Sequence, residues 1–419
     1  MTYEGFLSRA ASHMQESGIR KISAVGQKIP DLVPLAAGFP SPDTFAWDEF
    51  RAIANDLLSG KDASALQYGP TRGYAPLISA LIEVMAGRGV KAQESELLVT
   101  TGSQQGLDLV ARVLLDPGDV ALVELPSYAG AISAFRNTGA AIVGVRQDAD
   151  GVDLDDLARV TREQRAAGHR VRFLYVVPNF QNPTGLLIGL DKRRRLLEWA
   201  TREDVLIVED DPYGALFFTD VAQESDTRPI KADDPEGRVI YLSSFSKTLA
   251  PGFRVAWMVA PAPLTSHFEV AKQAIDISAG VLDQRVVFRA YEQGLLMSRL
   301  PMLRAHYQAK RAAMEQSLRA ELGDTLSWVQ PRGGFFIWAR FPEGIDTDAL
   351  IMRAVQRGVA YVTGSAFYVD EGASRRWARL SFSFPPIDRM REGVKRLAVA
   401  VREELAETSV PSASFPAAR

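Results

Sequence analysis

The chain has 419 residues, enough for a core domain of about 250 residues and a second lobe. With 47% hydrophobic and 24% charged residues, it cannot be wholly disordered. The 48 basic and 51 acidic side chains leave a formal net charge of -3 without a block of one sign, so no nucleic-acid or membrane partner is expected. The absence of cysteine excludes disulfides, thiolate metal sites and cysteine nucleophiles.

The sequence also predicts where the protein works. Glu4 and Arg9 stand where a secretory signal would need an apolar core. The longest uncharged stretch, Phe173 to Leu190, contains two prolines and several amide side chains, which a membrane helix would not tolerate. Because a chain without cysteine also fits a reducing compartment, we expect a cytoplasmic protein with no transmembrane segment.

The first part of the chain is predicted to form an arm. Residues 1–45 hold four prolines and no extended periodicity, so we expect them to pack on a smaller lobe rather than to fold alone.

Residues 46–295 are predicted to form an α/β domain. Short β-branched runs alternate there with helical patterns, which is typical of a mostly parallel, seven-stranded sheet flanked by helices. Because both faces of each run are apolar, every strand is expected to be buried. The seven predicted strands are Leu97–Thr100, Val120–Glu124, Ala141–Val145, Phe173–Val177, Val205–Val208, Val239–Leu242 and Val255–Val259.

Two helices can be placed from their patterns. Apolar residues recur at helical spacing from Leu107 to Leu114, which predicts a helix that starts near Ser103 and ends at Asp116-Pro117-Gly118. A longer charged amphipathic helix is predicted over Leu300–Leu322. Short strands around 334–338 and 379–384 follow, so residues 296–408 are expected to form a smaller α+β domain and 409–419 a tail.

A lysine follows one of the predicted strands. Lys247 stands in S-S-F-S-K, just after the strand that ends at Leu242, and the carboxyl ends of strands hold the active sites of open α/β sheets. The hydroxyls of Ser244 and Ser246 and the guanidinium of Arg254 are close in sequence and suit a phosphate dianion. A lysine near a phosphate indicates a Schiff base to a phosphorylated aldehyde, although a lone lysine would be a surface residue.

Two further strand ends carry groups that bind charge. In T-G-S-Q-Q the first free helix amides, at Ser103 and Gln104, can bind an anion, but Ser103 is equally explained as a helix cap. In E-D-D-P-Y, over residues 209–213, a buried carboxylate would need a cationic or N–H partner, which a protonated ring nitrogen would supply. The alternative is a helix cap at Asp211 before Pro212.

Two more motifs complete the set. Asn182, in N-F-Q-N-P-T-G, can donate to a phenolate oxygen, and Tyr128, in P-S-Y, can stack on a flat ring. Each alone is ordinary in a turn or a core. Because parallel strands end at one edge of a sheet, all five motifs are expected to converge, and together they match a single cofactor.

The chain resembles the fold-type-I pyridoxal-phosphate aminotransferases of class I/II, and within them the 2-aminoadipate and kynurenine aminotransferase branch. The resemblance covers nearly the whole chain. It rests on A-G-F-P at 37–40, L-Q-Y-G-P-T-R-G-Y at 66–74, T-T-G-S-Q-Q, N-P-T-G, E-D-D-P-Y, S-F-S-K and R-L-S-F at 379–382, in the family's order.

The resemblance implies a reaction and an assembly. An L-amino acid would give its amino group to pyridoxal 5'-phosphate by a ping-pong mechanism, and a 2-oxo acid, expected to be 2-oxoglutarate, would take it. The tyrosine that matches Tyr68 reaches a phosphate in the neighbouring subunit of family members, so a homodimer with shared active sites is implied.

The resemblance also implies residue roles. Lys247 would form the Schiff base and move the proton, and Asp210 would keep the pyridine nitrogen protonated. Tyr213 and Asn182 would bond the phenolic oxygen, and Tyr128 would stack on the ring. The phosphate would be held by Ser103, Gln104, Ser244 and Arg254.

The substrate carboxylate has its own expected partners. A bidentate guanidinium in a strand of the small lobe suits a carboxylate, and the family match selects Arg379 over Arg375 and Arg376 nearby. Asn182 and the backbone of Gly38 would complete that site. Arg20, in G-I-R-K-I-S, matches an arm residue that contacts the substrate side chain, although a surface arginine is the simpler interpretation.

The same motifs are compatible with other functions. The same residues would serve a pyridoxal-phosphate lyase, racemase or oxidase. A ligand sensor is less favoured, because no basic helix-turn-helix segment precedes the arm. Four scattered histidines lack ligand spacing, so no metal site is expected. The identity of the amino donor stays open.

Overall fold

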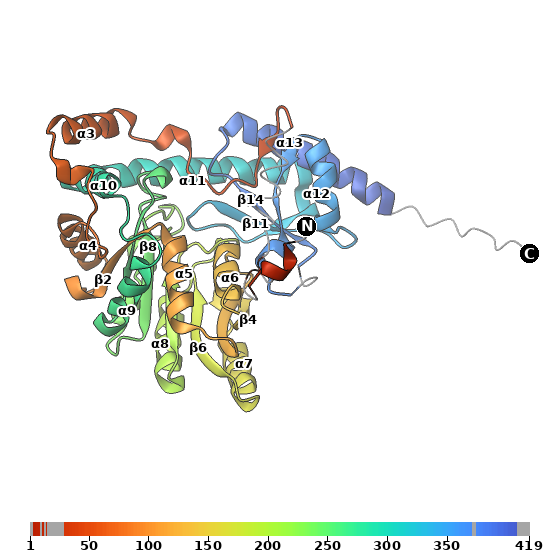
Figure 1. The fold of residues 1–419 in the computed structure, drawn as a ribbon. Helices are drawn as coiled ribbons and strands as arrows, with labels where there is room; N and C mark the ends of the chain where they lie inside the picture. Colours follow the sequence, from red (N-terminus) through yellow and green to blue (C-terminus); the bar gives the residue numbers. More distant parts are fainter. Residues whose placement is uncertain (1–2, 9–10, 12–13, 15–28, 371–373, 409–419) are drawn as a thin grey trace, which may run out of the picture.

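A twisted sheet of eight strands forms the centre of the computed structural model, which describes residues 3–8, 11, 14, 29–370 and 374–408 (Figure 1). The strand order is β2-β9-β8-β7-β6-β3-β4-β5, and β9 and β5 run opposite to the shared direction of the other six strands. The bounds are β2 Leu97–Thr101, β3 Asp119–Leu125, β4 Ala141–Asp148, β5 Gly151–Val152, β6 Arg170–Val176, β7 Leu206–Asp210, β8 Val239–Ser244 and β9 Val255–Val259.

The mostly parallel sheet is confirmed, and all seven predicted strands are present. The eighth, β5, has two residues and pairs antiparallel with the end of β4. Two residues give no periodic pattern, which is why the sequence did not reveal it.

The expectation that every strand is buried on both faces was wrong for β4. Ala141 is exposed, and residues 142–144 are only half-buried. The cause is position, because β4 lies next to the sheet edge with only the short β5 beyond it.

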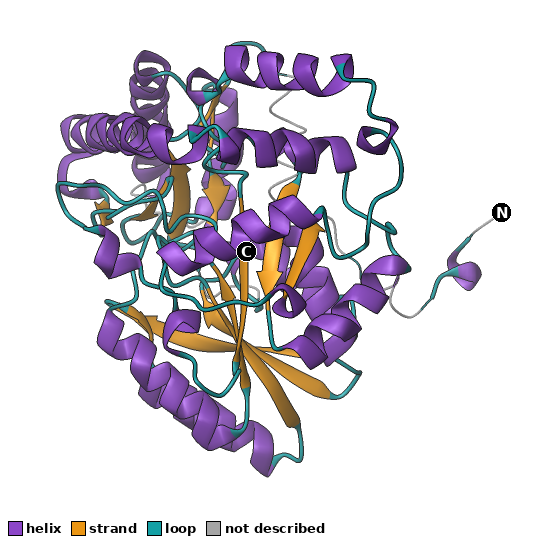
Figure 2. Cartoon of the chain, turned by 90° about the vertical axis from the view of Figure 1, so that its left-hand side faces the viewer, coloured by secondary structure: helices purple, strands orange, loops and turns teal. Residues whose placement is uncertain are grey.

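Helices cover both faces of this sheet. Leu98 faces α5, α6 and α9, whereas its neighbours Leu97 and Val99 face the side of α3, α4 and α10, as the two-residue period of a strand requires. The helices α7 and α8 lie on that second side over β6 and β7. Figure 2 shows the strands fanning out between these layers, which is the normal right-handed twist. The bounds are α3 Trp47–Ser59, α4 Ala75–Gly87, α5 Ser103–Leu114, α6 Ala129–Arg136, α7 Leu154–Ala166, α8 Leu190–Glu203, α9 Ala262–Gln273 and α10 Val281–Glu292.

A second, smaller sheet lies in the last third of the chain. It has the order β10-β11-β14-β13 with antiparallel pairing, and its core also contains the helices α11, α12 and α13. The helix α11 begins at Leu295, earlier than predicted, and carries Pro301 inside it. The bounds are β10 Ser327–Trp328, β11 Phe336–Arg340, β12 Val359–Ala360, β13 Val362–Thr363, β14 Trp377–Ser381, α11 Leu295–Leu322, α12 Thr347–Gln356 and α13 Ile387–Thr408.

The described end of the arm joins this smaller sheet region. Strand β1, Val33–Pro34, pairs in parallel with β12, and the amide of Val33 donates to the carbonyl of Gly358 at 2.8 Å. Packing of the arm on the small lobe is therefore seen for these residues. The domain boundaries 45/46, 295/296 and 408/409 stay predictions, and the predicted tail lies outside the described residues. Among the described helices, none combines the length and apolarity that crossing a bilayer demands.

Candidate active site

The five motifs from the large sheet meet at one edge, where the smaller sheet region faces it. Lys247 follows β8, Asp210 ends β7, Asn182 follows β6 and Tyr128 follows β3. Arg379, from β14 of the small sheet, reaches across and donates from Nη1 to Oδ1 of Asn182 at 2.8 Å. The predicted convergence of the strand ends therefore occurs, and it includes a residue from each sheet.

Lys247 is half-buried, and its amine lies over aromatic rings. Its Nζ donates to the carbonyl oxygen of Gly38 at 3.1 Å and lies 5.8 Å and 5.6 Å from the ring centroids of Tyr213 and Phe335. Burial lowers the pKa of Lys247 to about 8, helped by the positive charge of Arg379. A larger share of this amine is therefore uncharged near neutral pH than for an exposed lysine, which is what a nucleophile needs.

Asp210 presents an unpaired oxygen. Its Oδ2 accepts a hydrogen bond from the hydroxyl of Tyr175 at 2.9 Å, whereas its buried Oδ1 has no hydrogen-bond partner among the described residues. Burial raises the pKa of Asp210 to about 7. A buried carboxylate oxygen without a donor leaves room for an N–H group of a ligand, and a cationic one would stabilise its charge.

Arg379 is a buried cation. Its Nη2 donates to the carbonyl of Ala36 at 2.7 Å, its guanidinium lies 4.2 Å from the ring centroid of Phe336, and its Nε is unsatisfied. None of the carboxylates in the described residues forms an ion pair with it. Burial lowers the pKa of Arg379 to about 10. A buried guanidinium without a counter-ion is suited to bind an anionic ligand.

The N-terminus of α5 and the segment after β8 form a cradle for an anion. Gly102 precedes α5 with φ +78°, and a Cβ at this position would overlap the guanidinium of Arg254. Arg254 itself has φ +53°, and its Nη2 donates to Thr101 O at 3.4 Å. The buried hydroxyl of Ser103 has no partner in the described part of the chain, and Ser244 Oγ donates to Ser246 Oγ at 2.7 Å. The first amides of α5, these hydroxyls and the guanidinium together suit a phosphate dianion.

The predicted ring platform lies next to this cradle. Tyr128 precedes α6, and its hydroxyl donates to Oε1 of Gln104 at 3.3 Å. The amide of Gln104 in turn donates to the carbonyl of Gly130 at 2.8 Å. The two residues thus hold each other at the helix start.

Among the described residues, the predicted Tyr68 does not join this cluster. Tyr68 is 80% exposed, so its side chain is available to another molecule rather than to this site. Arg20 lies outside the described residues. Gly38, in contrast, lies inside the site, where a Cβ would stand 3.1 Å from the ring of Phe336.

Several contributors were not predicted from the sequence. Tyr175 looks like a core strand residue, and nothing in its local pattern indicates its bond to Asp210. Asp276 accepts hydrogen bonds from the Thr101 hydroxyl at 2.8 Å and from the Gln105 side-chain amide at 2.7 Å. These bonds help to fix the start of α5 in the cradle. The strand pairing places Tyr175 opposite Val208, and that register is not readable from one segment.

Comparison with known proteins identifies the family. The model of the aminotransferase class I and II family matches residues 30–397. The chain belongs to this family. It is 39% identical to aromatic-amino-acid aminotransferase 1 of Thermococcus litoralis over 406 residues, which covers 97% of this chain and 96% of the relative.

Solved structures agree with this assignment. Kynurenine aminotransferase of Pyrococcus horikoshii, in complex with PMP and with KYN and KYA, has a TM-score of 0.90 at 38% identity and covers 96% of this chain and 98% of its own. The α-aminoadipate aminotransferase of Thermus thermophilus, in complex with N-(5'-phosphopyridoxyl)-L-leucine, has a TM-score of 0.88 at 36% identity, with coverage of 97% and 100%. The chain is therefore a fold-type-I aminotransferase that uses pyridoxal phosphate, similar to the aminoadipate and kynurenine branch.

The residues on this edge fit that cofactor. Pyridoxal phosphate offers an aldehyde, a ring N–H and a dianionic phosphate. In the structure, the amine of Lys247 suits the aldehyde and the unpaired Oδ1 of Asp210 suits the ring N–H. The cradle around Ser103 and Arg254 suits the phosphate. Each part of the cofactor thus has a chemically matched group.

Proposed function

We propose that this aminotransferase carries an amino group from an L-amino acid to a 2-oxo acid, with 2-oxoglutarate as the acceptor, in two half-reactions at Lys247. The observation that carries the proposal is the amine of Lys247, which lies 3.1 Å from Gly38 O and within electrostatic reach of the Asp210 carboxylate and the Arg379 guanidinium. When bound, pyridoxal phosphate supplies an electron-withdrawing ring that accepts the electron pair left when the substrate loses its α-proton.

The chain's own residues would divide the remaining work. Lys247 binds the cofactor and moves the proton on and off the substrate, since burial favours its neutral form. Asp210 holds the ring nitrogen in its charged form, and Tyr213 and Asn182 donate to the phenolic oxygen. Arg379 binds the substrate carboxylate, with Asn182 and Gly38 beside it. Tyr128 supports the ring, the phosphate lies in the cradle, and the contact of Arg20 with the substrate side chain is proposed from the family resemblance.

Half-reaction spectroscopy tests this proposal. Holoenzyme mixed with an amino donor alone should convert once to the pyridoxamine form and stop, and 2-oxoglutarate should restore the starting spectrum. A lyase, racemase or oxidase would turn over repeatedly without an acceptor, so sustained product formation in the first step contradicts transamination. A panel of aromatic, acidic, basic and aliphatic donors would identify the substrate.

We also propose a homodimer with shared active sites. Tyr68 is 80% exposed and Leu66 beside it 74% exposed, so this segment offers an aromatic and an apolar side chain to another molecule. Hybrid complementation tests sharing. A dimer of one K247A chain and one Tyr68→Ala chain carries one site with both native residues if Tyr68 acts across the interface, so it should exceed either parent, whereas action within one chain predicts no gain.

The proposed setting is the cytoplasm, without nucleic-acid or membrane partners. The absence of cysteine and the balanced charge support this. Salt-sensitive binding to DNA or to anionic vesicles would contradict it.

A further inference from the structure

Three consecutive carboxylates are buried at the end of β7. Glu209, Asp210 and Asp211 are exposed by no more than 4% of their surface. Because side chains alternate along a strand, Glu209 and Asp211 lie on one face and Asp210 on the other, toward the cofactor site. Buried like charges raise one another's pKa, so this arrangement needs compensation behind the site.

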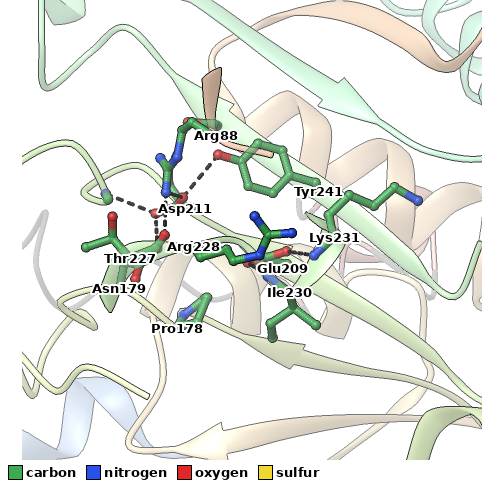
Figure 3. Close-up of polar contacts among 12 residues, drawn as sticks. Arg88, Pro178, Asn179, Glu209, Asp211, Thr227, Arg228, Ile230, Lys231 and Tyr241 are labelled. Atoms are coloured by element: carbon green, nitrogen blue, oxygen red, sulfur yellow. Dashed lines mark hydrogen bonds and ion pairs between the residues drawn. The ribbon is translucent and has the colours of Figure 1, made fainter. Parts of the chain in front are cut away.

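The negative charge of Asp211 is compensated by an ion pair and by hydrogen bonds to both of its oxygens. Its Oδ2 lies 3.0 Å from Nη2 of Arg88 and accepts from the Tyr241 hydroxyl at 3.1 Å. Its Oδ1 accepts from the Asn179 amide and from the Gly214 backbone, each at 2.9 Å. Figure 3 shows Arg88 and Tyr241 converging on this carboxylate. Both oxygens of Asp211 therefore have hydrogen-bond partners. The bond from the Gly214 amide also closes the turn from 211 to 214 onto the side chain of its first residue.

Arg88 is fixed at this position. It is the residue after Gly87 at the end of α4, and its Nη2 also donates to Thr227 O at 2.6 Å. A Cβ on Gly214 would stand 2.6 Å from the same nitrogen, so the guanidinium fills the space beside that backbone. The charge of Asp211 raises the pKa of Arg88 despite burial. Arg88 thus stays charged.

The second carboxylate on this face is satisfied differently. Glu209 accepts from the backbone amides of Ile230 and Lys231 at 2.8 and 2.9 Å, as Figure 3 shows. The buried Arg193 lies near enough to act on it by charge. Of the three acids, only Asp210 has a carboxylate oxygen without a hydrogen-bond partner.

We propose that Arg88 is a positioning residue for the cofactor: by pairing with Asp211 it anchors the 210–214 turn and leaves Asp210 as the one uncompensated carboxylate facing the ring nitrogen. This inference rests on the proposed role of Asp210. The hydrogen bond and ion pair of Arg88 go to Thr227 and Asp211 and not to a residue proposed to contact the cofactor, so it acts through Asp211.

The proposal predicts shifts of opposite sign. Without Arg88, the charge of Asp211 is unbalanced beside the site and favours the protonated form of every group there. Without the Asp211 carboxylate, Arg88 is unbalanced and favours the deprotonated forms. The other titratable groups around the pair are kept in both variants; they are Tyr241, Glu209, Glu224, Arg193 and Arg304.

The test compares R88M, D211N and the double variant as holoenzymes. The measured quantity is the pH midpoint of the visible absorption of the bound cofactor, with cofactor affinity and thermal unfolding as companions. We expect R88M to raise the midpoint by about one unit, D211N to lower it similarly, and the double variant to lie within about 0.3 units of wild type. The control is R228M, because Arg228 lies in the same region and its side chain pairs with Asp233 at 2.7 Å rather than with a carboxylate of β7.

Shifts of equal sign, or an R88M midpoint equal to wild type, would overturn the inference, since a purely structural residue lowers stability without opposed titration shifts. If R88M does not fold, R88K decides together with D211N. R88K keeps the positive charge but loses the planar guanidinium. Its midpoint should therefore match that of the wild type while its cofactor affinity falls. Unchanged cofactor affinity in R88K would contradict the positioning role. D210N distinguishes failure of this inference from failure of the proposed role of Asp210. If D210N shifts the midpoint and R88M does not, only the role of Arg88 is rejected. If D210N does not shift it, the role of Asp210 is rejected.

Discussion

The hydroxyl of Tyr175 donates a 2.9 Å hydrogen bond to Oδ2 of Asp210, and the two side chains come from the adjacent strands β6 and β7. This bond lowers the pKa of a carboxyl group that burial raises to about 7. Tyr175 therefore favours the charged form that the ring nitrogen needs.

Replacement of Tyr175 by Phe should weaken cofactor binding. The lost bond to a charged group is worth about 1.5–3 kcal/mol, so the dissociation constant should rise by about tenfold or more. Equilibrium dialysis measures it. The control is Y361F, which removes the bond from another buried tyrosine to Thr347 O at 2.7 Å in the small lobe. Equal weakening by both variants would mean that only general packing is involved.

Gly102→Ala should displace Arg254 and weaken the hold on the cofactor phosphate. A Cβ there meets the guanidinium, and φ of +78° adds strain of about 1–2 kcal/mol. Gly118→Ala is a matched control, because φ is +94° but nothing lies within 4 Å of its Cβ. Both variants should lose stability, and only G102A should lose cofactor affinity in titration. Similar affinity losses would show that strain alone accounts for the effect.

Arg379→Met should raise KM for the amino donor on the order of hundredfold, because one partner of a buried charge pair is removed. Steady-state kinetics with a fixed acceptor measures it. R375Q is the comparison, since Arg375 is exposed and pairs with Asp346 at 2.9 Å. An unchanged KM in R379M would reject the carboxylate role and reopen the choice among the neighbouring arginines.

The reactivity of Lys247 in the apoenzyme should depend on pH in an unusual window. Because burial lowers its pKa to about 8, trapping of a small aldehyde with borohydride should reach half its maximum near pH 8 rather than near the ordinary 10.5. In the same window the unfolded chain keeps a proton that the folded chain has lost, so this group makes stability rise with pH. K247M should remove both effects, as labelling by mass spectrometry and denaturant titration at pH 8 and pH 10 would show. A half-maximum near 10.5 would contradict the burial effect.

Much of the architecture was predictable because its signals are local. The start of α5 at Ser103 follows from Gly102 and the apolar stripe after it, and the lysine after β8 follows from its strand end. Once the strands are parallel, the meeting of their carboxyl ends needs no further information.

The parts that escaped prediction depend on pairing between distant segments. Arg88 is the residue that ends α4, and only the tertiary packing that brings the end of this helix to the turn after β7 makes it the counter-ion of Asp211. The exposure of β4 likewise depends on its place next to the sheet edge, which its own apolar residues do not encode. Sheet order and register decide both, and single-chain periodicity carries neither.

The pairing of β1 with β12 joins Val33 to Val359, near opposite ends of the chain. The carbonyls of Ala36 and Gly38, which accept from Arg379 and Lys247, follow directly after β1. During translation this strand has no mate until residue 359 has left the ribosome. The active site is thus completed among the last events of protein synthesis. Nascent chains arrested before residue 359 should therefore not retain pyridoxal phosphate.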